Sequence, residues 1–187
     1  MKTEDLQCAL TGKSLVIGEA VFLTISPDAV LLVDLNKELP GKHICLECKK
    51  EVVERAIKQG ILQDVFGVDI QIPTGFAEKI LLRLHKKAYD MLCMAKKSGA
   101  LVHGLEKVMT ALKADKCDFI LQASDGTEGG KQKAGLNSWN LRIFSVFTSA
   151  ELGRVTGKEK VVHMAVLKNN ANMSASLSAL MARIENF

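Results

Sequence analysis

Two kinds of hydrophobic spacing alternate along this chain of 187 residues and divide it into strands and helices. Near the N-terminus, runs rich in β-branched residues predict strands at residues 21–25 and 29–34, joined by a Ser-Pro-Asp turn. After a Leu-Pro-Gly break, apolar residues at helical spacing predict a helix over residues 47–59 and a second, shorter one over residues 62–66. The first part of the chain is therefore expected to form a small hairpin-plus-helix module of the α+β class.

The second part of the chain alternates helices and strands. Apolar side chains recur every three or four residues from Phe76 to Ala95, which predicts a long helix that ends at Ser98-Gly99. Further strands are predicted at residues 101–102, 117–123, 142–147 and 161–167, and further helices at residues 105–112, 127–140, 148–157 and 173–184. Thr148 and Glu151 have the spacing of a capping box. This alternation predicts an α/β fold, a three-layer αβα sandwich with helices on both faces of a sheet.

The stretch from Gly99 to Gly126 contains a strand, a glycine turn, a helix, a second strand and a polar loop. A helical crossover of this length usually joins parallel strands, so we expect residues 101–102 and 117–123 to form a parallel pair. The Ala-Ser-Asp-Gly loop then follows a strand end, where ligands commonly bind.

A Pro-Thr-Gly break separates the two parts and predicts domains at residues 1–75 and 76–187. Residues 1–75 hold 8 Lys and Arg against 11 Asp and Glu, a net charge of −3. Residues 76–187 hold 17 against 10, a net charge of +7. Because a positive surplus in one domain is typical of a domain that contacts phosphates, the second domain is expected to bind a polyanion.

Composition also excludes some classes of protein. No apolar run approaches the roughly 20 residues of a membrane span, and the N-terminus lacks the basic start and apolar core of a secretory signal. Five cysteines, an odd number without a dense framework, indicate reduced thiols. We therefore expect a cytoplasmic protein with no membrane role.

The C-x-x-C pair Cys45 and Cys48, with Cys8 and His43, is the only candidate metal site. Zinc requires four tetrahedral ligands, and the sequence supplies one properly spaced pair. Reduced structural cysteines are the favoured interpretation, zinc the second, and redox chemistry the third because no thioredoxin-like βαβ context surrounds the pair. We expect no metal and no cofactor.

Candidate catalytic residues are scattered. His85, His103 and His163 fall on different predicted elements, without the spacing of a metalloprotease or a Ser-His-Asp enzyme, and are interpreted as structural. Ser124-Asp125-Gly126 has no general base and no Walker-type loop beside it. The sequence therefore predicts that the protein is not an enzyme.

The ordered motifs Gly104, Ala123-Ser124-Asp125, Leu152-Gly153, Gly157 and the strand 161–167 resemble the ribosomal L7Ae/L30e superfamily of kink-turn RNA-binding proteins. The resemblance implies an αβα sandwich of that type, with RNA bound where three loops converge. A helix start after a glycine can receive phosphate, and lysines add sequence-independent attraction. The implied RNA-binding residues are Lys96, Lys97, Ser98, Gly99, Gly104, Glu106, Lys107, Thr110, Asp125, Lys158, Lys160 and Val161.

One turn differs from the kink-turn binders of this superfamily. Their helix opens with Gly-Thr-Asn-Glu-x-x-Lys, whereas residues 104–110 read GLEKVMT, and bacterial members often carry the Gly-x-Glu that Glu106 matches. An ionised carboxylate accepts hydrogen bonds, cannot donate them and repels phosphate. We therefore expect Glu106 to face base donors, and another bent or looped RNA to bind more tightly than a standard kink-turn.

The N-terminal part resembles the YlxR family of small bacterial proteins presumed to bind nucleic acid. Four short motifs carry the resemblance: Cys8-Ala9-Leu10-Thr11-Gly12, Ser26-Pro27-Asp28, Val33-Asp34-Leu35 and Leu39-Pro40-Gly41-Lys42. It implies nucleic-acid contacts beside the last motif, with Lys42 and His43 as the candidates. The negative charge of this part leaves a protein partner as the other interpretation.

Together these patterns predict a bacterial fusion of a YlxR-like module with an RNA-binding sandwich. It would act without catalysis on structured RNA, either ribosomal RNA or the RNA of a processing ribonucleoprotein. The alternatives are a protein-interaction adaptor and a nucleoid or DNA-associated regulator that acts through the YlxR-like half.

Overall fold

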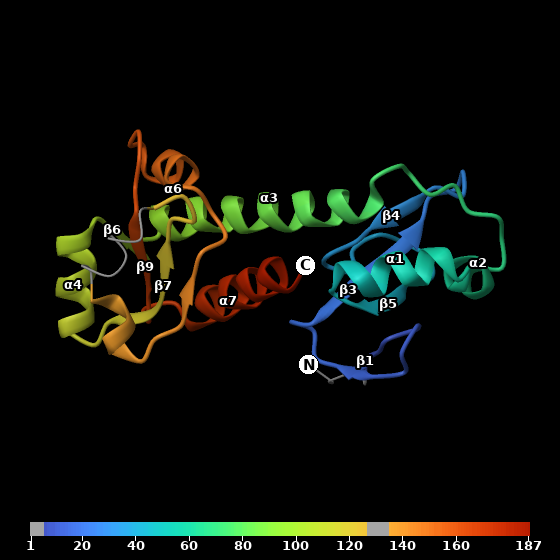
Figure 1. The fold of residues 1–187 in the computed structure, drawn as a ribbon, viewed down its shortest axis with the longest axis horizontal. Helices are drawn as coiled ribbons and strands as arrows, with labels where there is room; N and C mark the ends of the chain where they lie inside the picture. Colours follow the sequence, from blue (N-terminus) through green and yellow to red (C-terminus); the bar gives the residue numbers. More distant parts are fainter. Residues whose placement is uncertain (1–5, 127–134) are drawn as a thin grey trace. The chain divides into compact units, whose positions relative to one another are not determined.

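The computed structural model describes residues 6–126 and 135–187, which divide into two compact units (Figure 1). The first unit comprises residues up to 85 together with 182–187, and the second comprises residues 86–181. Helices α3 (Phe76–Lys97) and α7 (Ala171–Asn186) contribute to both units. The predicted boundary after residue 75 thus falls earlier than this division. Within the described residues, no helix is both long and apolar enough to cross a membrane.

The first unit is built on a three-stranded antiparallel sheet. Its strands, in spatial order, are β4 (Leu31–Val33), β3 (Ala20–Ile25) and β5 (Ile44–Glu47). The predicted hairpin is confirmed as β3 and β4. The unit also contains a small two-stranded sheet of β1 (Leu6–Gln7) and β2 (Ser14–Leu15) and two helices, α1 (Lys50–Lys58) and α2 (Ile61–Phe66).

Strand β5 was not expected from the sequence. The helix predicted from residue 47 begins at Lys50, because residues 44–47 pair with β3 in a register that places Leu46 opposite Val21. Residues 68–75, before the long helix α3, contain an isolated bridge between Gln71 and Val30. In both places the backbone conformation is set by pairing with a segment distant in sequence and does not follow the local hydrophobic pattern.

The second unit contains a four-stranded sheet with the spatial order β6-β9-β7-β8. Its strands are β6 (Leu101–His103), β9 (His163–Leu167), β7 (Cys117–Gln122) and β8 (Ile143–Phe144). The expected parallel pairing of β6 with β7 is wrong, because β9 lies between them and pairs antiparallel with both. The parallel neighbours in this sheet are β7 and β8.

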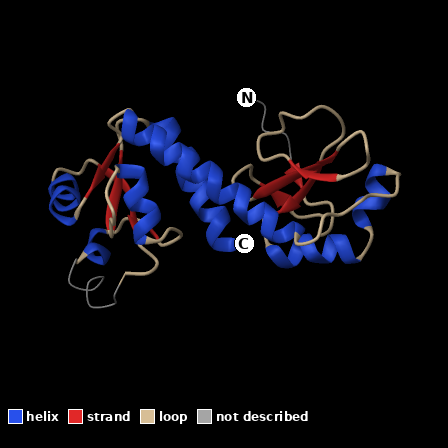
Figure 2. Cartoon of the chain, turned by 90° about the horizontal axis from the view of Figure 1, so that it is seen from above, coloured by secondary structure: helices blue, strands red, loops and turns tan. Residues whose placement is uncertain are grey.

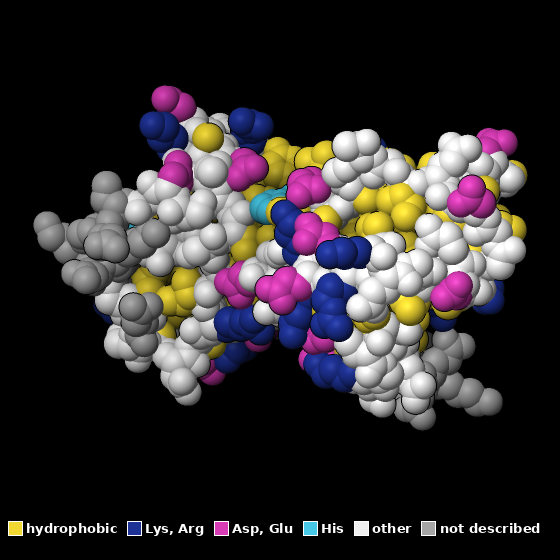
Figure 3. Space-filling view, turned by 45° about the vertical axis from the view of Figure 1, so that its right-hand side comes forward, with side chains coloured by type: hydrophobic (Ala, Val, Ile, Leu, Met, Phe, Trp, Pro, Cys, Tyr) yellow, Lys and Arg dark blue, Asp and Glu magenta, His cyan; other side chains and the backbone are white. Residues whose placement is uncertain are grey.

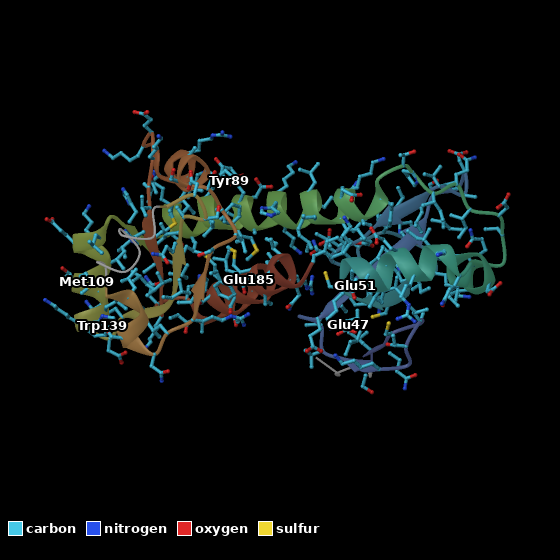
Figure 4. The ribbon with its side chains drawn as sticks, in the orientation of Figure 1. Glu47, Glu51, Tyr89, Met109, Trp139 and Glu185 are labelled. Atoms are coloured by element: carbon cyan, nitrogen blue, oxygen red, sulfur yellow. The ribbon has the colours of Figure 1, made fainter. Side chains whose placement is uncertain are left out.

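Helices cover both faces of this sheet (Figures 1 and 2). Helix α4 (Leu105–Lys113) covers one face, where Val108 and Leu112 pack with Ile120 and Ala165. Met109 and Trp139, labelled in Figure 4, lie at the margin of this cluster. Helices α3, α6 (Ser149–Thr156) and α7 lie on the other side (Figure 1). The predicted α/β class and three-layer αβα sandwich are confirmed.

Some predicted elements are shorter than expected. The predicted helix at 127–140 lies partly outside the described residues, and its described part holds a 3-10 turn, η1 (Leu136–Trp139). The strand predicted at 142–147 is reduced to β8. The capping box of α6 is confirmed: the Thr148 side chain accepts the Glu151 N–H, and the Glu151 carboxylate accepts the Thr148 N–H at 2.7 Å.

Gly153 on α6 allows the chain to fold back closely against this helix. A Cβ atom at this position would lie 2.7 Å from the carbonyl oxygens of Lys158 and Glu159. No side chain fits there unless the backbone of the α6–β9 loop moves. The loop is further held by the N–H of Lys158, which donates to the Gly153 carbonyl at 2.9 Å.

We predict that Gly153→Ala lowers the free energy of unfolding by about 1 to 3 kcal/mol, the usual cost of overpacking. Alanine improves helix propensity by only about 1 kcal/mol, which does not offset a clash with backbone. Urea unfolding measures the difference. The control Arg154→Ala, at an exposed position of the same helix, should change stability by less than about 0.5 kcal/mol. A Gly153→Ala protein as stable as the native one would contradict the prediction.

Candidate nucleic-acid interface

Helix α4 begins directly after β6, at the end of the sheet where β9 starts. Gly104 is its N-cap residue, with φ 85° and ψ 141°, a conformation that favours glycine. The Gly104 N–H donates to the His163 carbonyl at 2.9 Å, which attaches the helix start to β9. As a glycine, Gly104 has no side chain to accept from the first N–H groups of the helix. N–H groups at such a helix start can donate to a phosphate oxygen.

Three lysines from different segments lie near enough to His103, the last residue of β6, to act on its charge. Burial is the main reason that the pKa of His103 lies below its usual value, and Lys107, Lys96 and Lys158 lower it further in that order. The Lys96 Nζ atom also lies 3.9 Å from where a Cβ atom of Gly157 would be, so the end of α3 approaches the end of α6. The structure therefore brings together three positive charges at the start of α4.

The loop between α6 and β9 supplies the third of these charges. Its return to the sheet is held by the Val161 N–H, which donates to the Ser149 carbonyl at 2.9 Å. Basic and acidic side chains gather at this projecting loop, at the top left of the second unit in Figure 3. The first turn of α4 also presents Leu105, which is 40% exposed, beside the exposed Glu106 and Lys107.

The sequence interpretation of His103 as structural missed its place among the lysines. A sequence signal was present, since His103 is a polar residue at the end of an apolar strand and immediately precedes the glycine that opens a helix. His163 is different, because it is buried and its Nε2 has no hydrogen-bond partner among the described residues.

Comparison with known proteins relates this part of the chain to one family. Residues 86–176 match the model of the ribosomal protein L7Ae/L30e/S12e/Gadd45 family. These residues form an L7Ae/L30e-family domain. The domain covers most of the second unit, including β6, α4, β7 and β9.

Individual proteins similar to part of this chain were also found. The RNA-binding protein YlxQ of Enterococcus faecium is 27% identical over 79 residues, which cover 41% of this chain and 77% of that protein. A protein of unknown function from Bacillus halodurans C has 26% identity and a TM-score of 0.46, covering 51% of this chain and 97% of its own. A Giardia lamblia 15.5kD RNA binding protein has 12% identity and a TM-score of 0.45. The match covers 55% of this chain and 88% of that protein.

Three of the four residues implied at the end of α3 are not among the groups that act on His103. Gly99 lies beyond the other end of β6, where its carbonyl accepts a hydrogen bond from the Asn169 side chain at 3.2 Å. The Ser98 hydroxyl donates to the Ala95 carbonyl at 3.1 Å, and Lys97 is exposed on the last turn of α3. Lys96 is therefore the residue of this group that the structure places beside His103.

Other implied residues of the L7Ae/L30e domain have structural tasks. Asp125 accepts hydrogen bonds from the Ser149 N–H at 2.7 Å and the Ser149 hydroxyl at 2.9 Å, which lower its pKa and hold the start of α6. Lys160 lies close enough to add to that lowering. Val161 is buried. Thr110 is exposed one turn after Glu106 and donates its hydroxyl to the Glu106 carbonyl.

The two candidate nucleic-acid contacts in the first unit, Lys42 and His43, bind other groups of the same unit. His43 Nε2 lies 2.8 Å from the buried Asp34 carboxylate, and the Lys42 ammonium donates to the Val65 carbonyl. Asp34 also accepts the backbone N–H groups of Glu38 and Leu39. The motif implied to contact nucleic acid is thus held in shape by Asp34, and His43 serves the fold.

The cysteines of the first unit are unpaired thiols. Burial raises the pKa of Cys45 and of Cys48 to about 11, so both carry their protons at neutral pH. No three His, Cys, Asp or Glu side chains of the described chain come together as a metal ion would require. This geometry does not favour the candidate set of Cys8, His43, Cys45 and Cys48 as a zinc site.

Asp34 makes the stability of the first unit depend on pH. Burial acts to raise its pKa, but the hydrogen bonds from His43 and the backbone lower it to about 2. A depressed folded-state pKa gives stability that is present above the unfolded value near 3.9 and is lost as the pH falls toward 2.

We predict that Asp34→Asn removes on the order of 2 kcal/mol of this acid-dependent stability. Chemical unfolding between pH 5 and pH 2 should show a flatter pH dependence for Asp34→Asn than for the native protein. The exposed Asp64→Asn is the control and should keep the native slope. Equal slopes for the native protein and Asp34→Asn would contradict the prediction.

Proposed function

We propose that the protein binds structured RNA through the start of α4 and the lysines around it. The single observation that carries this proposal is the convergence of Lys96, Lys107 and Lys158 on His103, beside an uncapped helix start. The bound RNA is bent or looped and belongs to the ribosome or to a processing ribonucleoprotein. The protein acts in the cytoplasm, and the first unit is a YlxR-like module.

The chemistry of this surface suits a folded RNA. Lysine ammonium groups attract phosphates without regard to sequence, and backbone N–H groups at a helix start can donate to a phosphate oxygen. Bent or looped RNA also exposes unpaired bases. The exposed Leu105 offers such a base an apolar contact, and Glu106 offers an acceptor for a base N–H.

The family supports RNA over other polyanions. Residues 86–176 match the L7Ae/L30e family model, and a relative that covers 41% of this chain is named an RNA-binding protein. The positive surplus of residues 76–187 adds a general attraction.

Binding without catalysis is the function that we infer. His103 is the titratable group at the centre of the surface, and burial and the neighbouring lysines favour its neutral form. The carboxylate of Asp125, in the Ser124-Asp125-Gly126 motif, accepts hydrogen bonds from the backbone N–H and the hydroxyl of Ser149. The three lysines at this surface are cations and hydrogen-bond donors, which suit the holding of phosphates.

We predict that Lys107→Gln and Lys158→Gln each raise the dissociation constant for a bent RNA about tenfold, because each removes a charge-assisted contact. Each should also reduce the slope of log affinity against log salt concentration by about 1, the value expected for the loss of one phosphate contact. Fluorescence titration at several salt concentrations measures both effects. A folded RNA should compete better than duplex DNA of equal length.

Lys113→Gln is the matched control, because Lys113 lies exposed on the last turn of the same helix. Lys113→Gln should bind the bent RNA with the same affinity as the unmodified protein. If Lys113→Gln weakened binding as much as Lys107→Gln, the attraction would come from diffuse charge and the proposed surface would be wrong.

We predict a second effect at Glu106, which stands where kink-turn binders carry asparagine. Replacement by asparagine removes a charge that repels phosphate and adds a donor, so Glu106→Asn should tighten binding to a standard kink-turn about tenfold. The native protein should bind a different bent or looped RNA more tightly than the kink-turn. Titration of a kink-turn, a looped RNA and a plain hairpin at fixed salt measures these differences.

Glu106→Gln separates charge from shape, since it removes the charge and keeps the length of the side chain. Glu106→Gln should give only part of the increase in kink-turn affinity that Glu106→Asn gives. If the native protein already preferred the kink-turn strongly and Glu106→Asn changed nothing, the assignment of Glu106 would be refuted.

A further inference from the structure

A second positively charged site lies in the first unit, outside the L7Ae/L30e domain. It is a pocket of about 190 Å³, lined by Lys13 just before β2, by the loop between β2 and β3, by the end of β5 and the two residues after it, and by the last turn of α7. Its charged and amide side chains are Lys13, Glu19, Glu47, Lys49, Arg183 and Asn186. Glu47 is labelled in Figure 4. All of these residues belong to the first unit.

Arg183 is the buried charge of this pocket. Only 7% of its surface is exposed, its Nε donates to the Gly18 carbonyl at 3.1 Å, and a terminal nitrogen donates to the Ile17 carbonyl. The titratable groups that act on its charge are the thiols of Cys48 and Cys45, which are protonated and neutral at pH 7, and no carboxylate among the described residues pairs with it. A buried guanidinium without an anionic partner is unfavourable unless another group supplies the negative charge.

The two lysines of the pocket add to this surplus. The ammonium groups of Lys13 and Lys49 lie 2.9 Å and 3.0 Å from the same Oε1 atom of Glu47. One carboxylate therefore balances one of these two charges and leaves the other. With Arg183 and the exposed Glu19, the lining carries three cations against two carboxylates.

A purely structural role accounts for part of this arrangement. Arg183 holds the loop between β2 and β3 through two carbonyl groups, which uses two of its five N–H donors. The structural role does not require two further lysines beside it, nor an open space between them. Guanidinium and ammonium groups around a small pocket are the usual arrangement for an oxyanion.

We propose that this pocket binds a phosphate group, with Arg183, Lys13 and Lys49 as the cationic donors and the Asn186 amide as a neutral donor. The phosphate comes from one of two sources, a free phosphate ion or the backbone of a bound RNA. In either case it supplies the negative charge that Arg183 lacks. This proposal is independent of the RNA surface at α4.

The test uses the full-length protein and inorganic phosphate as the probe. Isothermal titration, in chloride of matched ionic strength, should show saturable binding of phosphate at one site. Lys49→Gln should raise the dissociation constant for phosphate about tenfold, because it removes a charge-assisted hydrogen bond. Lys49 is half-exposed, so its replacement leaves the core intact.

Lys58→Gln is the matched control, because it removes a charge from the other end of α1 and does not line the pocket. Lys58→Gln should bind phosphate with the same affinity as the unmodified protein. Arg183→Lys, which keeps the charge and loses the planar fork, should weaken phosphate binding as well. Absence of saturable phosphate binding, or equal affinities for Lys49→Gln and Lys58→Gln, would overturn the proposal.

RNA titration then identifies the source of the phosphate. If phosphate competes with RNA and Lys49→Gln weakens RNA binding several-fold, the occupant is an RNA backbone phosphate. If neither occurs while phosphate still binds, the occupant is a free phosphate ion. Because the phosphate measurement contains no RNA, its failure and the failure of the proposed RNA surface are distinguishable.

Discussion

The second unit depends on the insertion of β9 between β6 and β7. The registers place His103 opposite Met164 on one side of β9 and Gln122 opposite His163 on the other. The carbonyl of His163 then accepts the Gly104 N–H and sets the position of the α4 start. Because β9 follows β6 by about sixty residues of chain, this edge of the sheet forms only after long-range pairing, which carries a loop-closure cost.

Fold stability and ligand binding place different demands on the start of α4. A carboxylate in the first turn interacts favourably with the helix dipole, an effect of about 0.3 to 1 kcal/mol, so Glu106 has a structural benefit that needs no RNA. The same charge repels phosphate. Lys107 beside it and Lys96 and Lys158 from other segments offset that repulsion. The surface as a whole thus remains attractive to a polyanion, and Glu106 sets which part of the ligand can approach.

The first unit uses its charged groups differently, because several of them are held inside the fold. Asp34 is enclosed by His43 and by backbone N–H groups, which makes the loop after β4 a defined structure. Arg183 connects the last turn of α7 to the loop around Gly18, a contact between residues far apart in the sequence. A net charge counted along the sequence does not distinguish such internal charges from those that face a ligand.

The sequence alone determined the elements whose signals are local. The stripe of α3, the short helix α2 and the capping box of α6 were predicted correctly, because spacing and caps act within one or two turns. The tertiary structure decided the strand order, the existence of β5, and the grouping of Lys96, Lys107 and Lys158 around His103. These features depend on contacts between segments distant in sequence, and such contacts leave no periodic trace in the chain.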